Sequence, residues 1–264
     1  LRKQYALFAK EEFGIDVNPS ENVIVTVGGM EALFLALNTL VEKGDEIIVL
    51  GPYYVNYVQM IGMCDGTAVV ADIYGKPDEA RIATLQQAIS PRTKGIIVNN
   101  PCNPSGEVLT DNFLQAIADF AIEHDLFIIA DEVYSSLVFD GKKHRSLLSN
   151  AAIRDRTVLI DSCSKRFAMT GWRVGFAVGP KIIIENMIKM QENVAACAPL
   201  PSQYAAIEAY SERTNREYIV QTFEQRRNVI YGGLQNSKGL TCSKPEATFY
   251  MFVNIEGTGL KSEE

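Results

Sequence analysis

The sequence has few of the residues from which disulfide frameworks, zinc sites and histidine-based catalytic centres are built. Its five cysteines are odd in number, lie far apart and include no C-x-x-C pair, a pattern that favours neither disulfides nor a zinc site. Only two histidines are present, His124 and His144, so few bases exist to activate a thiol for catalysis. We predict reduced cysteines, no metal site and a cytoplasmic location.

Long apolar runs and an excess of basic residues are also missing. No stretch of about 18 apolar residues could span a bilayer, and residues 1–10 lack the apolar core and small-residue cleavage site of a secretory signal. The 25 Lys and Arg residues are outnumbered by 32 Asp and Glu residues, giving a net charge of −7, which argues against a nucleic-acid partner. Because the chain begins at Leu1, we expect its natural start to lie upstream.

Short apolar runs alternate with segments of helical periodicity along most of the chain. Strands are expected at residues 22–27, 46–50, 67–73, 95–99, 126–130, 157–160 and 174–178. Helices are expected at residues 1–13, 31–41, 77–89, 110–123, 180–195, 202–211 and 217–234. This alternation predicts an α/β fold, a mainly parallel sheet flanked by helices, with its functional residues at the carboxyl ends of the strands. Two later strands, at 239–242 and 248–253, would begin a new element.

The most informative stretch is the polar loop between two of these strands, which reads Ser-Cys-Ser-Lys-Arg-Phe-Ala-Met-Thr-Gly-Trp-Arg-Val-Gly from Ser162 to Gly175. Lys165 stands close to two serines and eight residues before Arg173. A lysine held beside cationic and hydroxyl groups can have a lowered amine pKa, which makes it a nucleophile toward an aldehyde. The arginine and a serine hydroxyl suit a phosphate. The plain alternative is a solvated surface loop.

Other polar groups follow predicted strands elsewhere. The Gly28-Gly29-Met30 turn leads from a strand into a helix, whose first N–H groups are unpaired and can bind an anion. Asp131 follows a fully apolar strand, where a carboxylate is costly without a partner. Asn103 lies in a loop with two Asn-Pro steps, which restrict the backbone before each proline. Tyr54 follows a strand end and could stack on a flat ring.

These motifs resemble the signatures of the class I and II aminotransferases, fold-type I enzymes that depend on pyridoxal 5'-phosphate (PLP). The matching segments are Ser-x-x-Lys with Thr-Gly-Trp-Arg-x-Gly, Asn-Pro-x-Asn-Pro-Ser-Gly and Asp-Glu-x-Tyr. The resemblance implies that Lys165 carries PLP as an internal aldimine and then acts as the general base. It also implies that Asp131 pairs with the pyridinium nitrogen, and that the expected reaction moves an amino group from an amino acid to a 2-oxo acid.

The remaining cofactor contacts are also implied by the resemblance. Asn103 and Tyr134 would bind the phenolic oxygen of PLP, and Tyr54 would stack on its ring. The phosphate would be held by the residues of two turns, namely Gly29, Met30, Ser162 and Arg173, with Ser164 as a helper. Tyr53 and Tyr57 are interpreted as core residues, and His144, in a run with Gly141 and two lysines, as exposed.

The resemblance extends over almost the whole chain, but complete members of the family are longer at both ends. We therefore expect a PLP-binding large domain at residues 1–195. Residues 196–264 are expected to hold the interdomain helices and the incomplete start of a small α+β domain. In that segment, Ala247 replaces a glycine that is usual in the family. The arginine that binds the substrate carboxylate in the family would lie outside this chain, so the substrate stays open. A homodimer is expected.

Two alternatives remain open from the sequence. The first is a different PLP reaction on the same scaffold, such as carbon–sulfur lyase or synthase chemistry, because the cofactor residues alone do not select the reaction. The second is a non-catalytic sensing domain, as in transcription regulators that carry an aminotransferase-like domain. A product assay for pyruvate and ammonia separates the first alternative from amino transfer, and DNA binding by a full-length product would support the second.

Overall fold

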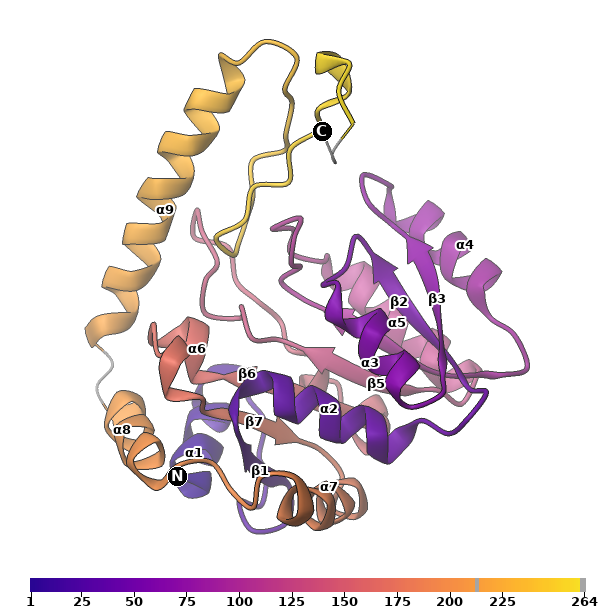
Figure 1. The fold of residues 1–264 in the computed structure, drawn as a ribbon, viewed down its shortest axis with the longest axis vertical. Coiled ribbons are helices and arrows are strands. Elements are labelled where there is room, and N and C mark those ends of the chain that lie inside the picture. Colours follow the sequence, from indigo (N-terminus) through magenta and orange to yellow (C-terminus); the bar gives the residue numbers. More distant parts are fainter. Residues whose placement is uncertain (212–213, 262–264) are drawn as a thin grey trace.

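The computed structural model describes residues 1–211 and 214–261. A seven-stranded sheet runs through the molecule, in the strand order β1-β7-β6-β5-β4-β2-β3 (Figure 1). β7 pairs antiparallel with both of its neighbours, and the other neighbouring strands pair in parallel. The predicted mainly parallel sheet is confirmed. The strands are β1 (Val23–Thr26), β2 (Glu46–Gly51), β3 (Thr67–Asp72), β4 (Thr93–Asn99), β5 (Phe127–Asp131), β6 (Thr157–Ser162) and β7 (Gly175–Val178).

Helices cover both faces of this sheet, as a buried parallel sheet requires. One face packs against α2, α3 and α7, and the other packs against α4 and α5 at one end and α1 and α8 at the other. The helices are α1 (Arg2–Phe13), α2 (Gly28–Leu40), α3 (Asn56–Met63), α4 (Asp78–Ala88), α5 (Asp111–Glu123), the one-turn α6 (Cys163–Arg166), α7 (Lys181–Val194), α8 (Leu200–Ser211) and α9 (Thr214–Gln235). Short 3-10 turns lie at η1 (Leu147–Ser149), η2 (Ala151–Arg156), η3 (Thr170–Trp172) and η4 (Glu256–Thr258).

The sheet centre is apolar along its whole length because neighbouring side chains alternate between two buried faces. All six residues of β2 and all six of β6 are buried. In β6, Val158 and Ile160 pack on the face covered by α2, whereas Leu159 packs on the face covered by α1. Polar residues are therefore confined to the strand ends, and this arrangement places the functional groups at one edge of the sheet.

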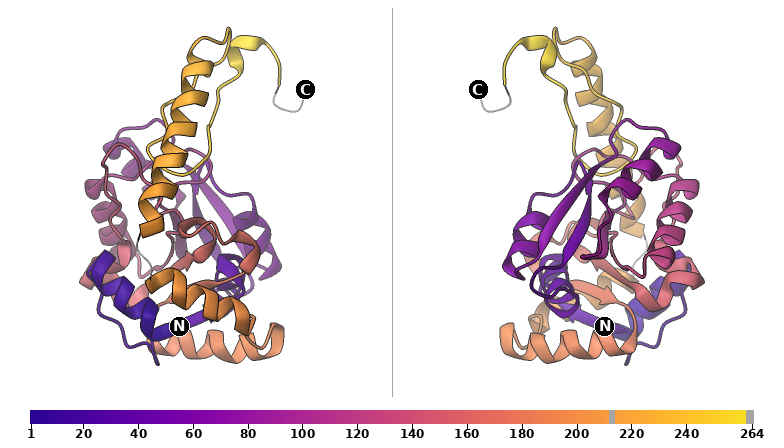
Figure 2. Two further views of the ribbon diagram at one scale, coloured as in Figure 1. Left: turned by 90° about the vertical axis from the view of Figure 1, so that its left-hand side faces the viewer. Right: turned by 90° about the vertical axis from the view of Figure 1, so that its right-hand side faces the viewer.

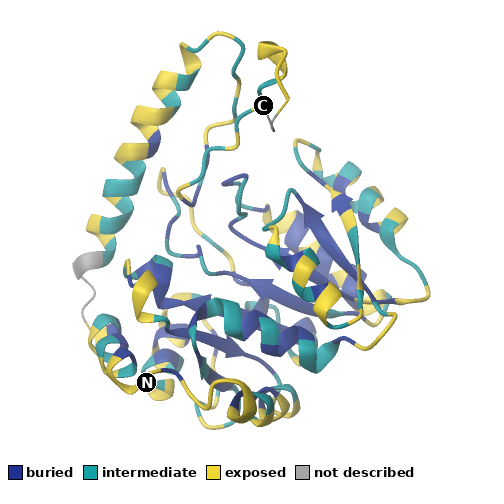
Figure 3. Ribbon diagram, in the orientation of Figure 1, coloured by how far each residue is buried: buried dark blue, intermediate teal, exposed yellow. Residues whose placement is uncertain are grey.

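The C-terminal part of the chain is built differently. The C-terminal end of α9 and the segment that directly follows it project beyond the sheet and its helices in both side views (Figure 2), and α9 is mainly exposed or half-buried (Figure 3). The strands predicted at 239–242 and 248–253 are wrong: this region has only two isolated bridges, Thr241 with Asn254 and Val138 with Ala247. A β-rich segment becomes a strand only where a neighbouring strand accepts its hydrogen bonds, and within the described residues these segments have none. Among the described residues, no helix is long and apolar enough to cross a membrane.

Candidate active site

The lysine loop forms a tight turn at the end of β6. The Ser162 side chain accepts a hydrogen bond from the backbone N–H of Ser164 at 3.1 Å and so begins the one-turn helix α6. Lys165 lies in this turn, with its Nζ 5.6 Å from the ring centre of Tyr134 and 4.9 Å from that of Phe249. Partial burial and the nearby Arg173 guanidinium lower the pKa of the lysine amine. The turn thus presents an amine that loses its proton more readily than an exposed lysine.

The turn is anchored from behind by the residue that follows the lysine. Arg166 is completely buried and forms an ion pair with Asp161 at 3.1 Å, with side chains 0% and 1% exposed. It also donates to the Ser135 hydroxyl at 2.9 Å, and Tyr5 of α1 donates to Asp161 at 3.1 Å. Since Asp161 and Arg166 flank the segment that contains Ser162 and Lys165, their pairing fixes both ends of the lysine turn.

A glycine turn faces the same space. Gly28 begins α2 with φ +75°, and a Cβ placed on it would lie 2.5 Å from the Arg173 guanidinium. A Cβ on Gly175 would lie 2.4 Å from the Gly28 carbonyl carbon. These close approaches bring the unpaired N–H groups of the first turn of α2 beside the guanidinium and the Ser162 and Ser164 hydroxyls. Helix N–H groups and an arginine together form an anion-binding site.

Asp131 lies at the end of β5 and is 7% exposed. Its Oδ2 accepts a hydrogen bond from the Tyr57 hydroxyl at 2.5 Å, and its Oδ1 is 3.4 Å from the Val133 backbone nitrogen. Burial raises the pKa of Asp131 to about 6, although the hydrogen bond from Tyr57 acts in the opposite direction. Within the described residues, Asp131 has no ion-pair partner. A buried carboxylate of this kind favours a cationic ligand.

The ends of β4 and β5 are joined by side-chain amides. Asn99 donates to the Asp131 carbonyl at 3.0 Å and accepts from the Asn103 backbone N–H at 2.7 Å. On the opposite side, the Tyr134 hydroxyl donates to the Tyr250 hydroxyl at 3.2 Å. Burial and Tyr250 raise the pKa of Tyr134, so its phenol stays protonated. Its single O–H proton is donated to Tyr250 in this structure and would have to turn toward a ligand to bind it. The Tyr54 hydroxyl lies 3.6 Å from the Met30 sulfur.

The lysine turn, the start of α2 and the ends of β4 and β5 border one cavity of about 140 Å³. Each of the ten residues proposed from the sequence lines it: Gly29, Met30, Tyr54, Asn103, Asp131, Tyr134, Ser162, Ser164, Lys165 and Arg173. Six further residues complete the lining: Leu33, Tyr57, Asn99, Val133, Thr170 and Tyr250. The fold therefore assembles an amine, a buried carboxylate, an anion-binding turn and aromatic rings around one space.

Two residues differ from their sequence interpretation. Tyr57 is buried as expected of a core residue, yet its hydroxyl binds Asp131. The signal was available in the residue type, because a buried tyrosine hydroxyl needs a partner that a phenylalanine would not need. His144 was expected to be exposed, and its side chain is 2% exposed and lies against Glu132. Among the described residues, no cluster of His, Cys, Asp and Glu is arranged to hold a metal ion.

Comparison with known proteins identifies the family. The profile named Aminotransferase class I and II matches residues 1–263. The chain belongs to the class I and II aminotransferases. It is 36% identical to aromatic-amino-acid aminotransferase 2 of Thermococcus litoralis, over 100% of this chain and 69% of that protein. It is 39% identical to an aspartate aminotransferase of Geobacillus stearothermophilus, over 94% of this chain and 63% of that protein.

Solved structures show the same relationship. The aromatic aminotransferase of Pyrococcus horikoshii OT3 superposes with a TM-score of 0.94 at 34% identity, over 99% of this chain and 71% of that chain. The chain thus spans about two thirds of the length of its aminotransferase relatives. The fold is that of the aminotransferase large domain.

Class I and II aminotransferases use PLP, and the cavity suits this cofactor. Gly28 lets the Arg173 guanidinium lie against the start of α2, since a Cβ there would be 2.5 Å from it. A phosphate at this turn would therefore meet both the helix N–H groups and the guanidinium. The buried Asp131 carboxylate lacks a cation among the described residues, and a protonated pyridine nitrogen would supply one. Lys165 lines the same cavity with an amine whose pKa is lowered. The donor set therefore matches the three functional parts of PLP.

Proposed function

We propose that this aminotransferase binds PLP in the cavity at the strand ends, with Lys165 as the residue that attaches it covalently. The Asp131 carboxylate carries the argument: it is buried, has a raised pKa and has no cation partner in the described part of the chain. It faces the same cavity as a lysine with a lowered pKa. A buried acid and an amine with opposite pKa shifts are typical of a functional site.

PLP, when bound, supplies an aldehyde and an electron-withdrawing pyridine ring. The Gly29 and Met30 amides, Arg173 and the Ser162 and Ser164 hydroxyls would hold its phosphate. Asp131 would keep its ring nitrogen protonated, and Asn103 and Tyr134 would donate hydrogen bonds to its phenolic oxygen. Tyr54 would lie against the ring.

Lys165 would also move the substrate proton. Its amine lies near the rings of Tyr134 and Phe249, which exclude water from one side. A free amine whose pKa is lowered toward neutrality is a more effective general base than an ordinary lysine. We propose that the Lys165 amine removes the α-proton of an amino acid and moves this proton within the site. The amino group is then transferred to a 2-oxo acid.

The relatives suggest which substrates to test. The matched proteins include an aromatic-amino-acid aminotransferase and aspartate aminotransferases, so aspartate and aromatic amino acids are the first donors to examine. We further propose that the protein acts as a homodimer in the cytoplasm.

Covalent labelling tests the lysine assignment directly. Wild-type protein is incubated with PLP, reduced with borohydride, digested and analysed by peptide mass mapping. We expect the reduced adduct on Lys165 of the wild type and no adduct in Lys165→Ala. Lys189 is an exposed lysine on α7, and the control variant Lys189→Ala should be labelled like the wild type. Label on other lysines with none on Lys165 would contradict the proposal. Conversion of 2-oxoglutarate to glutamate with aspartate or phenylalanine then tests amino transfer, and release of pyruvate and ammonia instead would indicate lyase chemistry.

A further inference from the structure

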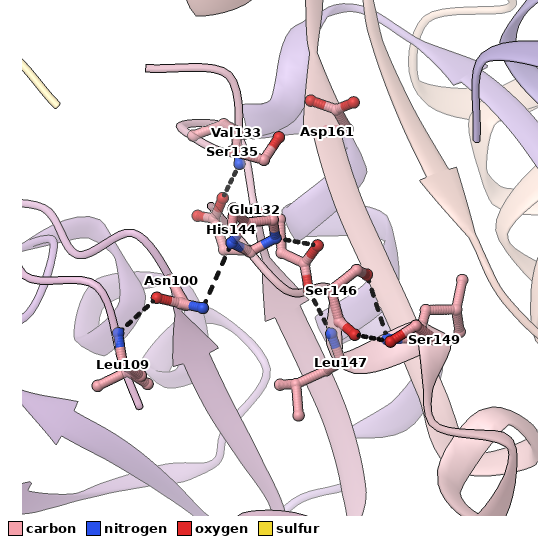
Figure 4. Close-up of polar contacts among 12 residues, drawn as sticks. Asn100, Leu109, Glu132, Val133, Ser135, His144, Ser146, Leu147, Ser149 and Asp161 are labelled. Carbon is pink, nitrogen blue, oxygen red and sulfur yellow. Dashed lines mark hydrogen bonds and ion pairs between the residues drawn. The ribbon is translucent and has the colours of Figure 1, made fainter. Parts of the chain in front are cut away.

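A buried histidine and carboxylate lie directly behind the strand ends that line the cavity. His144 Nε2 is 2.8 Å from Glu132 Oε2, and the two side chains are 2% and 1% exposed (Figure 4). The other carboxylate oxygen of Glu132 accepts from the Leu147 backbone N–H at 2.8 Å. Neither residue is among those that line the cavity, so the pair is not part of the site described above.

Asn100 determines where the imidazole proton lies. Its side-chain oxygen accepts from the Leu109 backbone N–H at 3.0 Å, so its NH₂ group points toward the ring and lies 3.4 Å from His144 Nδ1 (Figure 4). An amide NH₂ only donates hydrogen bonds, and Nδ1 must therefore accept. The proton is then on Nε2, where it is donated to Glu132. This arrangement places the Nε2 side of the ring against the Glu132 carboxylate and the Nδ1 side against the Asn100 amide.

This network connects the two strand ends that carry cavity residues. Asn100 and Glu132 directly follow Asn99 and Asp131, which are opposite one another in the β4–β5 register. The Asn100 backbone N–H also donates to the Asp131 carbonyl at 3.1 Å. Because side chains alternate along an extended chain, Asn99 and Asp131 face the cavity while their successors face His144. The imidazole thus contacts both strand ends from outside the cavity.

We propose that His144, as the neutral Nε2–H tautomer, is a positioning residue that fixes the ends of β4 and β5 relative to each other. This fixes the spacing between Asp131 and the loop that carries Asn103, two groups proposed to contact PLP, and the inference therefore rests on the proposed function. His144 acts through Glu132 and Asn100 and does not itself touch the cofactor.

Two variants each keep one of the two polar contacts of the imidazole and remove the other. In His144→Asn the amide oxygen replaces Nδ1 and keeps the contact with Asn100, but the side chain is too short to reach Glu132. In His144→Gln the amide nitrogen replaces Nε2 and keeps the contact with Glu132, but the acceptor for Asn100 is lost. Each variant should raise the PLP dissociation constant about two- to tenfold, the effect of one hydrogen bond. His144→Phe removes both contacts of the ring and leaves Glu132 Oε2 buried without the donor from His144. It should raise the PLP dissociation constant by a larger factor, on the order of tenfold or more.

The control is the second histidine of the chain. His124 caps the end of α5 and lies edge-on to Phe120, with ring centres 4.6 Å apart. His124→Gln should leave the PLP dissociation constant unchanged. Binding is titrated by cofactor absorbance on protein shown by circular dichroism to be folded, and thermal unfolding of the PLP-free variants is measured in parallel. Variants that lower the melting temperature but bind PLP like wild type would overturn the positioning role.

The tautomer is tested without PLP. Nitrogen-15 NMR of labelled histidines in the cofactor-free protein, assigned with the His124→Gln variant, should show His144 protonated at Nε2 and unprotonated at Nδ1 near neutral pH. An Nδ1–H tautomer or a doubly protonated ring would overturn the assignment. If Lys165 is labelled by PLP and the His144 variants bind normally, this inference fails while the proposed function stands. If wild-type protein does not bind PLP, both fail.

Discussion

The lysine turn and the C-terminal region meet at the cavity, and each is held by an Arg–Asp ion pair. The two pairs differ in how far they are exposed to water. Behind the lysine turn, Arg166 and Asp161 have side chains 0% and 1% exposed. In the C-terminal region, Arg227 of α9 pairs with Asp140, and these side chains are 4% and 43% exposed. The first pair is enclosed by the core, whereas the second keeps its carboxylate in water. The lysine turn is therefore fixed by the folding of the whole sheet, and the C-terminal contact is fixed only locally.

Backbone contacts show the same difference. The strand ends are joined by continuous ladders between β4, β5 and β6. Among the described residues, the C-terminal segment reaches the sheet body through four backbone bonds. Gly106 O accepts from Glu246 N and Ala247 N, Leu137 O accepts from Thr248 N, and Phe139 N donates to Glu246 O, each at 2.9 Å. These contacts place Tyr250 at the cavity. Asp131 and Asn103, which are proposed to bind PLP, therefore lie at strand ends joined by these ladders, whereas Tyr250 belongs to a segment held by fewer backbone bonds.

The largest expected effect comes from breaking the buried ion pair. Arg166→Met should lower the free energy of unfolding by about 3–5 kcal/mol, because Asp161 is left as an uncompensated buried charge. Arg227→Met is the matched variant, and it should cost about 1 kcal/mol, since Asp140 remains hydrated. Urea denaturation of the two variants measures both values. Equal losses would show that the two regions do not differ in the way proposed.

Asp131 and Asp140 are each expected to have a smaller, pH-dependent effect on the stability of the protein. The folded pKa of Asp131, about 6, lies above the unfolded value near 3.9. The folded PLP-free protein therefore binds more protons between these values, and this group's contribution makes stability fall as pH rises from about 4 to about 6, by up to roughly 3 kcal/mol. Asp131→Asn should remove this fall.

The contribution of Asp140 to stability should change with pH in the opposite direction. Hydrogen bonds from Arg227 lower its pKa, so its contribution is present above the unfolded pKa and is lost as pH falls through the folded pKa. Asp140→Asn should therefore weaken the protein near neutral pH and leave it less sensitive to acid. Melting temperatures of the PLP-free wild type, Asp131→Asn and Asp140→Asn, measured from neutral pH to below the unfolded aspartate pKa of about 3.9, test both signs. A wild-type profile unchanged by Asp131→Asn would contradict the burial argument.

The smallest effect concerns the docking of the C-terminal segment. Gly106 has φ +69°, and a Cβ there would lie 2.6 Å from Pro245 and 2.9 Å from the Ala247 carbonyl oxygen. Gly141 has φ +71° with nothing within 4 Å of an added Cβ. Both alanine variants should cost about 1–2 kcal/mol for the left-handed backbone, and only Gly106→Ala should also release the segment. Limited proteolysis should cut residues 236–261 faster in Gly106→Ala alone; equal cleavage in both would contradict this role for Gly106.

A feature could be predicted from the sequence where local burial determines it, as it does for the groups at the strand ends. Residues such as Lys165, Asp131 and Asn103 follow apolar runs that become buried strands, so the parallel sheet brings them to one edge. The family signatures gave them roles, which remain proposals. The α/β fold followed from the alternation of strands and helices, because both patterns reflect local burial.

Features that depend on distant partners were not predictable in this way. His144 sits in a polar run with two lysines, and its burial follows from Glu132, twelve residues earlier in the chain. Tyr57 is a core residue by its helical position, and only the fold places Asp131 at its hydroxyl. The segments at 239–242 and 248–253 have strand-like composition but no neighbouring strand among the described residues.

A crystal structure of the protein with PLP would show whether the cavity at the strand ends holds the cofactor. We expect electron density that joins PLP to Lys165, a phosphate between the Gly29 amide and Arg173, and a ring nitrogen at hydrogen-bond distance from Asp131. We also expect little change in the strand ends when PLP binds. PLP bound elsewhere, or bound in this cavity with no contact to Lys165 and Asp131, would contradict the proposed site.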